Sequence, residues 1–239
     1  MSMLMIVAII CAYVVKGLVG FANTLVFSSI VSFQTSNLNI SPVELLVGYP
    51  ANAWIAWRER HSLQKKIWLP LSITVILGSI PGAFLLKHVD ASILKVIFGV
   101  VIILVGVEML LRPYTSSKKG DSSLLLGIIG LFSGILCGLF GIGALLSAYV
   151  SRTTTDSQSF RGNMCLVFVI ENTFRIFLYG ATGILSLPIL YTACKLLPFM
   201  GIGLLAGSLL ARRLHETYVK RLVILMLILS GISLIVKTL

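Results

Sequence analysis

Long apolar stretches alternate with short polar breaks along nearly the whole chain. The eight apolar segments cover residues 3–33, 42–57, 67–86, 91–111, 123–150, 163–180, 184–210 and 218–236. Several of them reach the roughly 20 residues that a helix needs to cross the hydrocarbon core of a membrane. The alternation of apolar and polar residues that membrane β-strands show is not present. The pattern therefore predicts an all-α polytopic membrane protein.

Similar glycine-rich motifs interrupt the first and the fifth apolar segment. Residues Gly17–Ala22 read Gly-Leu-Val-Gly-Phe-Ala, and residues 138–143 read Gly-Leu-Phe-Gly-Ile-Gly. Broken helices at corresponding places in two halves are typical of transporter binding sites. The arms 3–16 and 21–33 are each about 20 Å long, too short to cross a membrane alone. We therefore expect two re-entrant or V-shaped hairpins.

The second half of the chain repeats the order of the first half. Gly78 and Gly82 correspond to Gly203 and Gly207, in addition to the two hairpin motifs. We therefore predict two structural repeats, each a broken hairpin followed by three transmembrane helices. The predicted parts are an N-terminal repeat 1–112 (hairpin 3–33, helices 42–57, 67–86 and 91–111), a linker loop 113–122 and a C-terminal repeat 123–239 (hairpin 123–150, helices 163–180, 184–210 and 218–236).

The distribution of basic residues favours an inverted arrangement of the two repeats. Lys and Arg number 19 against 8 Asp and Glu, and the excess lies in short loops rather than in a stripe suited to nucleic acid. If both hairpins return to the side they entered, thirteen basic residues share one face and only Lys87, Lys95 and Lys237 lie on the other. Eight simple crossings would divide them equally. Basic loops lie in the cytoplasm, so we expect a multi-pass protein of the plasma (inner) membrane with both termini outside.

The paired Gly-x-x-Gly hairpins, the residues Pro50-Ala51-Asn52 and the stretch Gly203–Arg213 together resemble the TauE/SafE family, also called the toluene-sulfonate uptake permease family. The resemblance covers nearly the whole chain. It implies transport, usually outward, of sulfite or small organosulfur anions across the plasma membrane. Ala22, Asn23 and Thr24 depart from the family pattern, because many members carry glycines or apolar residues there.

Polar groups near the two motifs are the candidates for binding such an anion. The predicted site consists of Lys16, Gly20, Asn23, Thr24, Asn52, Gly141, Gly143, Asn172 and Arg175. Lys16 lies inside an apolar segment, where a charge costs on the order of 3 kcal/mol. It either contacts an anion, forms a structural ion pair or extends to the membrane surface. Asn23 and Thr24 begin the returning half-helix, whose free N–H groups favour anions, although Asn23 could equally serve as a cap.

Arg175 is the strongest single candidate, because its planar guanidinium fits two oxygens of an oxyanion. Glu171 lies one turn earlier on the same helix face. It either neutralises Arg175 or, when protonated, releases it and couples transport to protons. By contrast, Ser41-Pro42-Val43-Glu44 reads as a capping box with proline at the first helical position, which gives Glu44 a structural role.

The remaining candidates each have a structural alternative. Asn52 and Asn172 lie about 120 positions apart, in segments two and six. They serve either as ligands of the anion or as partners in interhelical hydrogen bonds. Gly141 and Gly143 offer either bare backbone to a ligand or close helix packing. The small-residue stripe Gly127, Gly130, Gly134 and Gly138 serves either a homodimer or an internal contact.

These features together predict a secondary transporter of small anions, in which one half rocks against the other to expose the site to each side in turn. A passive anion channel is the first alternative, and a membrane assembly subunit or enzyme without transport activity is the second. We expect no catalytic residues, no metal and no cofactor, because neither a nucleophile with its base nor a cluster of Cys and His occurs at a suitable spacing.

Overall fold

A computed structural model describes residues 3–31, 37–88, 123–140, 143–154 and 156–211 continuously, together with scattered residues between 92 and 111 and between 213 and 236. Within these ranges the regular elements are helices and no strand occurs, as the apolar pattern predicts. The helices are α1 (Met3–Val19), α2 (Asn23–Val31), α3 (Asn37–Arg58), the 3-10 turn η1 (Arg60–Ser62), α4 (Lys65–His88), α6 (Ser123–Phe140), α7 (Ala144–Thr153), α8 (Ser157–Ala181) and α9 (Leu187–Ala211).

The first apolar segment is broken at the glycine motif. Gly20 and Ala22 have φ angles of +93° and +72°, in the left-handed region. An L-residue such as Ala22 pays roughly 1–2 kcal/mol there, so the right-handed helix stops at Val19 and a new one starts at Asn23. α1 and α2 pack on each other, and so do α6 and α7 on either side of the second motif. Each glycine motif therefore lies at the bend between two packed helical arms.

The helices differ from the predicted boundaries mainly at their starts. α3 begins at Asn37 and contains Pro42, so the predicted capping box is wrong and Glu44 lies inside the helix, buried at 4% exposure. α8 begins at Ser157 instead of 163, because Asp156 caps it by accepting a hydrogen bond from the Ser159 amide at 2.7 Å. Both helices are longer than their apolar stretches because polar residues such as Ser41 and Ser159 continue them.

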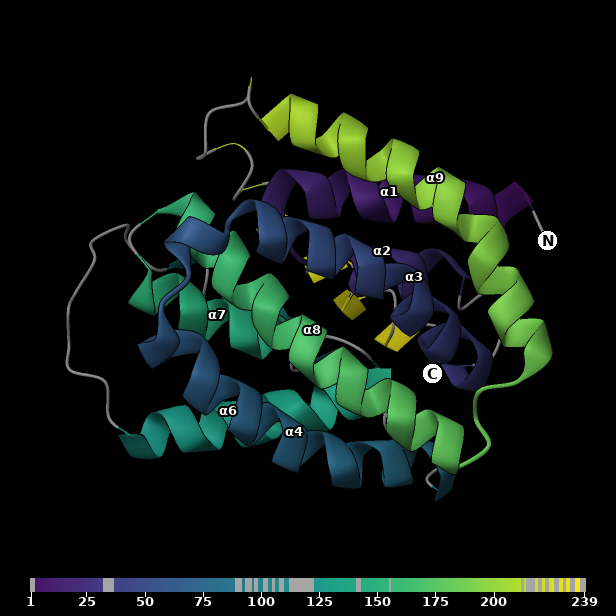
Figure 1. The fold of residues 1–239 in the computed structure, drawn as a ribbon, viewed down its shortest axis with the longest axis horizontal. Helices are drawn as coiled ribbons and strands as arrows, with labels where there is room; N and C mark the ends of the chain where they lie inside the picture. The colour runs from purple at the N-terminus through teal and green to yellow at the C-terminus, as the bar shows by residue number, and fades with distance from the viewer. Residues whose placement is uncertain are drawn as a thin grey trace.

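Each half of the chain packs its hairpin on a helix of the other half. The most extensive contacts join α1 with α9 and α4 with α6, and these pairs lie side by side in Figure 1. A Cβ added to Gly207 would lie 2.1 Å from the carbonyl oxygen of Val14, and one added to Gly134 would lie 2.2 Å from that of Val75. Both pairs therefore touch backbone to backbone through glycine. Gly130 and Gly134 face α4, so at these positions the small-residue stripe serves an internal contact.

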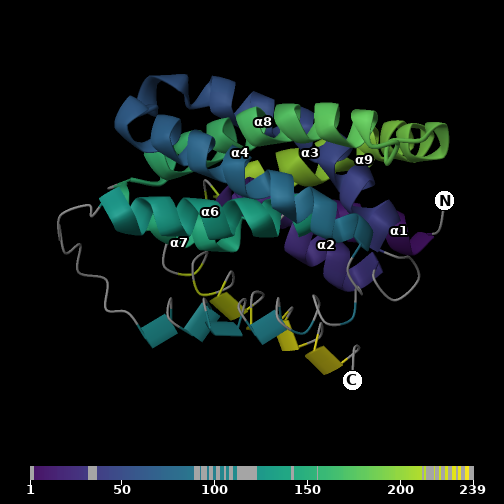
Figure 2. The ribbon, with the colours of Figure 1, turned by 90° about the horizontal axis from the view of Figure 1, so that it is seen from below.

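Three further helix pairs contribute to the main body. α3 packs on α8 across the centre, and in addition α3 packs on α9 while α8 packs on α4. Figure 2 shows the described residues of 92–111 and 218–236 as a separate layer along one side. There Gly99 and Gly231 lie against each other, since a Cβ on either glycine would come within 2.8 Å of the other's carbonyl oxygen.

One end of the molecule brings together two polar segments that are distant in sequence. The amide of Gln64 donates to the side-chain oxygen of Asn163, and the Gln64 side chain donates to Ser159, both at 3.0 Å. A Cβ on Gly162 would lie 3.1 Å from Cβ of Glu59. The turn that follows α3 therefore lies beside the first turns of α8.

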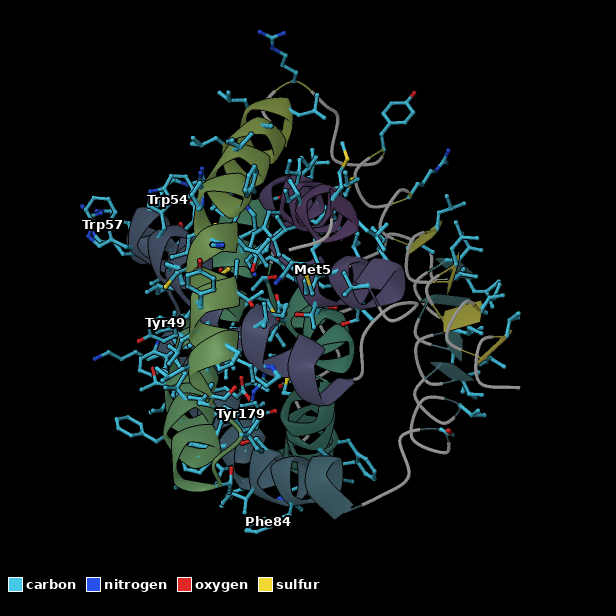
Figure 3. The ribbon with its side chains drawn as sticks, turned by 90° about the vertical axis from the view of Figure 1, so that its right-hand side faces the viewer. Met5, Tyr49, Trp54, Trp57, Phe84 and Tyr179 are labelled. Carbon is cyan, nitrogen blue, oxygen red and sulfur yellow. The ribbon has the colours of Figure 1, made fainter. Side chains whose placement is uncertain are left out.

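The outer surface carries large apolar side chains. Two of the described helices, α8 and α9, are long and apolar enough to cross a membrane, and α1 is apolar but shorter. Near the end of α3, Trp54 and Trp57 point away from the body in Figure 3, and the guanidinium groups of Arg58 and Arg60 lie 4.7 and 4.9 Å from their rings. Tryptophan beside basic residues is typical of the boundary between lipid and water.

Candidate binding site between the two helix breaks

A pocket lies where the two broken hairpins meet. Its lining comes from both breaks and from α8: Phe21, Ala22, Asn23, Thr24, Leu25, Gly143 and Phe168. Asn23 is the first residue of α2, and Gly143 immediately precedes α7. The structure thus brings the predicted residues Asn23, Thr24 and Gly143 to one pocket, at the starts of two half-helices.

The backbone at this pocket suits a negatively charged group. The amides of Val26 and Ser147 make the first i to i−4 bonds of α2 and α7, to the carbonyls of Ala22 and Gly143. The first N–H groups of a helix in general lie before the start of its own hydrogen-bond ladder. Such N–H groups and the positive end of the helix dipole favour anions.

A buried network connects the pocket to two charged side chains. Lys16 donates to Oδ1 of Asn23 at 2.8 Å, and Nδ2 of Asn23 donates to Oε1 of Glu44. Tyr13 also donates to this carboxylate oxygen, at 3.4 Å. Lys16 is 1% exposed, so it does not extend to the membrane surface. The carboxamide of Asn23 instead lies between a cation and a carboxylate, with each end turned to the partner that it can bind.

Phe168 of α8 separates this network from the second break. The ammonium group of Lys16 lies 5.8 Å from the centre of the Phe168 ring. On the other side, a Cβ added to Gly143 would lie 2.3 Å from Cζ of the same ring. The aromatic ring therefore fills the space between the two hairpins, and the glycine at 143 allows it to do so.

Arg175 and Glu171 form a second buried charge cluster near the end of α6. Arg175 donates to Oε1 of Glu171 at 3.4 Å and to the carbonyl oxygen of Cys137. Its guanidinium carbon lies 5.4 Å from the centre of the Tyr179 ring. Both charged side chains are 1% exposed, and Oε2 of Glu171 and Nε of Arg175 make no hydrogen bond within the described part of the chain. The predicted pairing of Glu171 with Arg175 is present, and each group keeps one atom unused.

The two clusters occupy corresponding places in the two hairpins. Lys16 directly precedes the first glycine motif, and Cys137, whose carbonyl binds Arg175, directly precedes the second. Glu44 comes from α3 and Glu171 from α8, the helices that follow the two hairpins. Glu44 also lies within electrostatic range of Glu171 and Arg175. Each hairpin bend thus has one buried cation and one buried carboxylate beside it.

The other predicted residues lie outside the pocket lining. Gly20 packs on α8, where its carbonyl accepts a bond from the thiol of Cys165 at 3.5 Å. Asn52 and Asn172 are buried on α3 and α8, and Oδ1 of Asn52 has no hydrogen-bond partner among the described residues. Gly141 lies outside the described residues.

Two residues of this region were not predicted from the sequence. Glu44 was assigned to a helix cap because of the proline at 42, although a carboxylate inside a membrane segment is itself a signal of function. Phe168 is one of many apolar residues in its segment and carries no signal of its own. Only the packing of α8 across both breaks distinguishes it.

A comparison with protein families decides the class of the chain. The sequence model of the family described as "Sulfite exporter TauE/SafE" matches residues 5–234. The chain belongs to the TauE/SafE sulfite exporter family. The match includes both glycine motifs and the charged residues of both buried clusters, and it confirms the resemblance found in the sequence. No curated protein and no solved structure matched the chain. TauE/SafE proteins are membrane transporters, and the apolar helices agree with a multi-pass protein of this kind.

Proposed function

We propose that the protein is a secondary transporter that moves sulfite or a small organosulfur anion across the plasma membrane by alternating access. The observation that carries this proposal is the pocket into which the starts of α2 and α7 converge. Two positive helix ends and the nearby ammonium group of Lys16 supply charge for an oxyanion at a depth where water is scarce. Outward transport is the direction that the family implies.

The architecture of this transporter is two inverted repeats, 1–112 and 123–239. The packing partners support it, because α1 on α9 corresponds to α6 on α4, and α3 on α9 corresponds to α8 on α4. The contact of Gln64 with Asn163 supports a shared face for the loops around both residues. With simple crossings these loops would lie on opposite sides. The shared face is basic and cytoplasmic by the positive-inside rule.

In this proposal the anion lies against the first turn of α2, near Asn23 and Thr24, with Gly143 opposite. The oxygens of sulfite or a sulfonate accept hydrogen bonds from amides at the two helix starts, and Lys16 supplies the opposite charge. Asn52, Asn172 and Arg175 are the next contacts along the path. Oδ1 of Asn52 and Nε of Arg175 have no hydrogen-bond partner among the residues that the structure describes. This supports a role beyond packing, because buried polar atoms are normally paired.

Charge balance favours coupling to protons. The buried cations Lys16 and Arg175 are matched by the carboxylates Glu44 and Glu171, so an added anion would leave an uncompensated negative charge. Protonation of Glu171 would release Arg175 to take the anion from the pocket in the next step and would restore neutrality there. A proton and an anion would then cross together.

The helix contacts favour moving units that each combine helices from both halves of the sequence. α1 is locked against α9 by the contact between Val14 and Gly207, and α4 against α6 by that between Val75 and Gly134. We propose that these two pairs move as units, with α3 and α8 between them. The pocket opens to one side when the pairs separate there and to the other side when they separate at the opposite end.

Reconstitution in liposomes tests this proposal. Purified protein is assayed for movement of sulfite, sulfoacetate and related anions with and without an imposed proton gradient. Accumulation against the anion gradient supports a coupled transporter, flux that ignores the proton gradient would indicate a channel, and absence of flux would indicate neither. Arg175→Gln should abolish transport, whereas Arg58→Gln, which removes a partly exposed arginine paired with Glu59, should not.

A further inference from the structure

The transport scheme gives Glu44 only a compensating charge, but its contacts indicate more. Its carboxylate is 4% exposed and, within the described residues, its hydrogen bonds come from Asn23 and Tyr13 rather than from a cation. Asn23 lines the pocket and also holds Lys16. The carboxylate thus reaches the pocket through one amide, and a charged group in a membrane core needs such a reason to be there.

We propose that Glu44 controls anion binding in the pocket, acting through the carboxamide of Asn23 on Lys16. The inference rests on the proposed function and deepens it. When Glu44 is ionised, its charge compensates that of Lys16 and its hydrogen bond fixes the Asn23 side chain between them. When a proton from water adds to the carboxylate, the network carries one net positive charge. The pocket then attracts the anion, and one proton and one anion are bound together.

The other groups around Glu44 do not provide the same control. The groups facing Glu44 are Tyr13 and Lys16 from α1, Asn23 from α2, Cys137 from α6, and Glu171 and Arg175 from α8. Glu171 and Arg175 are paired with each other, so their opposite charges largely cancel in their effect on Glu44. On α9, Lys195 is exposed and lies 4.1 Å from the ring of Tyr191. Lys16 is therefore the cation whose charge Glu44 compensates.

A measurable consequence is proton uptake when the anion binds. If one proton must be bound for the anion to bind, the affinity falls about tenfold for each pH unit above the midpoint. Glu44 acts through Asn23 and is a positioning residue, so the decisive readout is the pH profile of binding rather than the loss of activity.

Binding to the full-length protein in detergent is measured by calorimetry as a function of pH. Methanesulfonate is the first probe because its charge does not change with pH. The wild type should bind more weakly as pH rises, whereas Glu44→Gln should bind with the wild-type low-pH affinity at every pH. Glu59→Gln is the matched control, since Glu59 pairs with Arg58 at 2.9 Å outside the pocket, and it should keep the wild-type profile. A pH profile that survives Glu44→Gln would overturn the inference.

With sulfite as the probe, the affinity of the wild type is divided by that of Glu44→Gln at each pH. The ionisation of sulfite affects both proteins equally, so it cancels in this ratio. Tyr13→Phe provides a second test that keeps every charge. It removes a donor that stabilises the ionised carboxylate, so the midpoint should move to higher pH, and an unchanged midpoint would count against Glu44. If the wild type binds no sulfur anion and moves none, the proposed function fails as well. If the wild type binds and transports but Glu44→Gln has an unchanged profile, only the present inference fails.

Discussion

Gly143 lies so close to Phe168 that a methyl group at position 143 would come within 2.3 Å of the aromatic ring. This contact joins the second helix break to α8, and through Phe168 to the side of the pocket occupied by Lys16. The size of residue 143 therefore sets where the ring lies, and the ring sets the shape of the pocket.

Gly143→Ala should displace the ring toward the pocket and weaken anion binding. The cost in stability is about 1–3 kcal/mol, as for other additions to a packed core. Binding calorimetry and thermal unfolding in detergent measure the two effects. Gly127→Ala in α6 is the control, because a Cβ there meets nothing within 4 Å. Equal behaviour of the two variants would contradict this account of the ring.

Two glycines of α9 should respond differently to the same substitution. Gly207→Ala places a Cβ 2.1 Å from the carbonyl oxygen of Val14 and should separate α9 from α1, at about 1–3 kcal/mol. Gly201→Ala meets nothing within 4 Å and should be neutral or stabilising by up to about 1 kcal/mol, the difference in helix propensity. Thermal unfolding in detergent compares them. A stable Gly207→Ala variant would show that the close approach of the helices is not needed.

The pair Arg175 and Glu171 should show strong coupling in a double-mutant cycle. Either Arg175→Gln or Glu171→Gln leaves a buried charge without its partner, which costs on the order of 3–5 kcal/mol. The double variant removes both charges and should recover much of that loss. Thermal unfolding of all four proteins measures the coupling. Additive losses would mean that the two side chains do not depend on each other.

Substitutions at Asn52 and Asn163 should have different effects, one on anion binding and the other on stability. Oδ1 of Asn52 has no partner within the described ranges, whereas the Asn163 side chain bonds to Gln64, Ser62 and Ser159. Asn52→Leu should therefore weaken anion binding with little loss of stability. Asn163→Leu should cost about 1–3 kcal/mol in stability, because its partners are left unpaired, and should leave binding intact. If Asn52→Leu changes neither property, Asn52 is not a ligand.

The inverted arrangement predicts the side from which surface positions react. Single cysteines are introduced at Gln64, Gln158 and Ser186, which are exposed, in a background without the four native cysteines. A membrane-impermeant thiol reagent should modify positions 64 and 158 from the same side and position 186 from the other. Modification of positions 64 and 158 from opposite sides would contradict the inverted arrangement and support eight simple crossings.

The hydrophobic pattern was enough to predict the helical class, because lipid imposes long apolar helices. The family was found from a resemblance in particular motifs, the two glycine hairpins, Pro50-Ala51-Asn52 and Gly203–Arg213. Neither was enough to predict the role of Glu44. Pro42 suggested a helix start, yet α3 continues through it from Asn37. The sequence also could not reveal that Asn23 lies between Lys16 and Glu44, since this contact depends on the angle at which α2 returns along α3.

The four candidates at the helix breaks also show what the sequence could and could not predict. Asn23, Thr24 and Gly143 reach the pocket because they follow the two breaks, which the motifs locate. Gly20 also lies at a break, but its left-handed backbone turns it toward Arg161 and Cys165 of α8 instead. Local sequence locates a bend well, whereas the direction that each residue of the bend faces is decided by the helix packed on it.

The contact of Gly207 with Val14 also has a consequence for biogenesis. α1 leaves the ribosome long before Leu187–Ala211, the helix that it packs on most extensively. During synthesis the first hairpin must wait in the bilayer, with its broken tip and buried charges shielded by something other than their final neighbours. Insertion and final assembly are thus separated in time for this chain, and a ribosome that stalls before residue 187 leaves α1 without its main support.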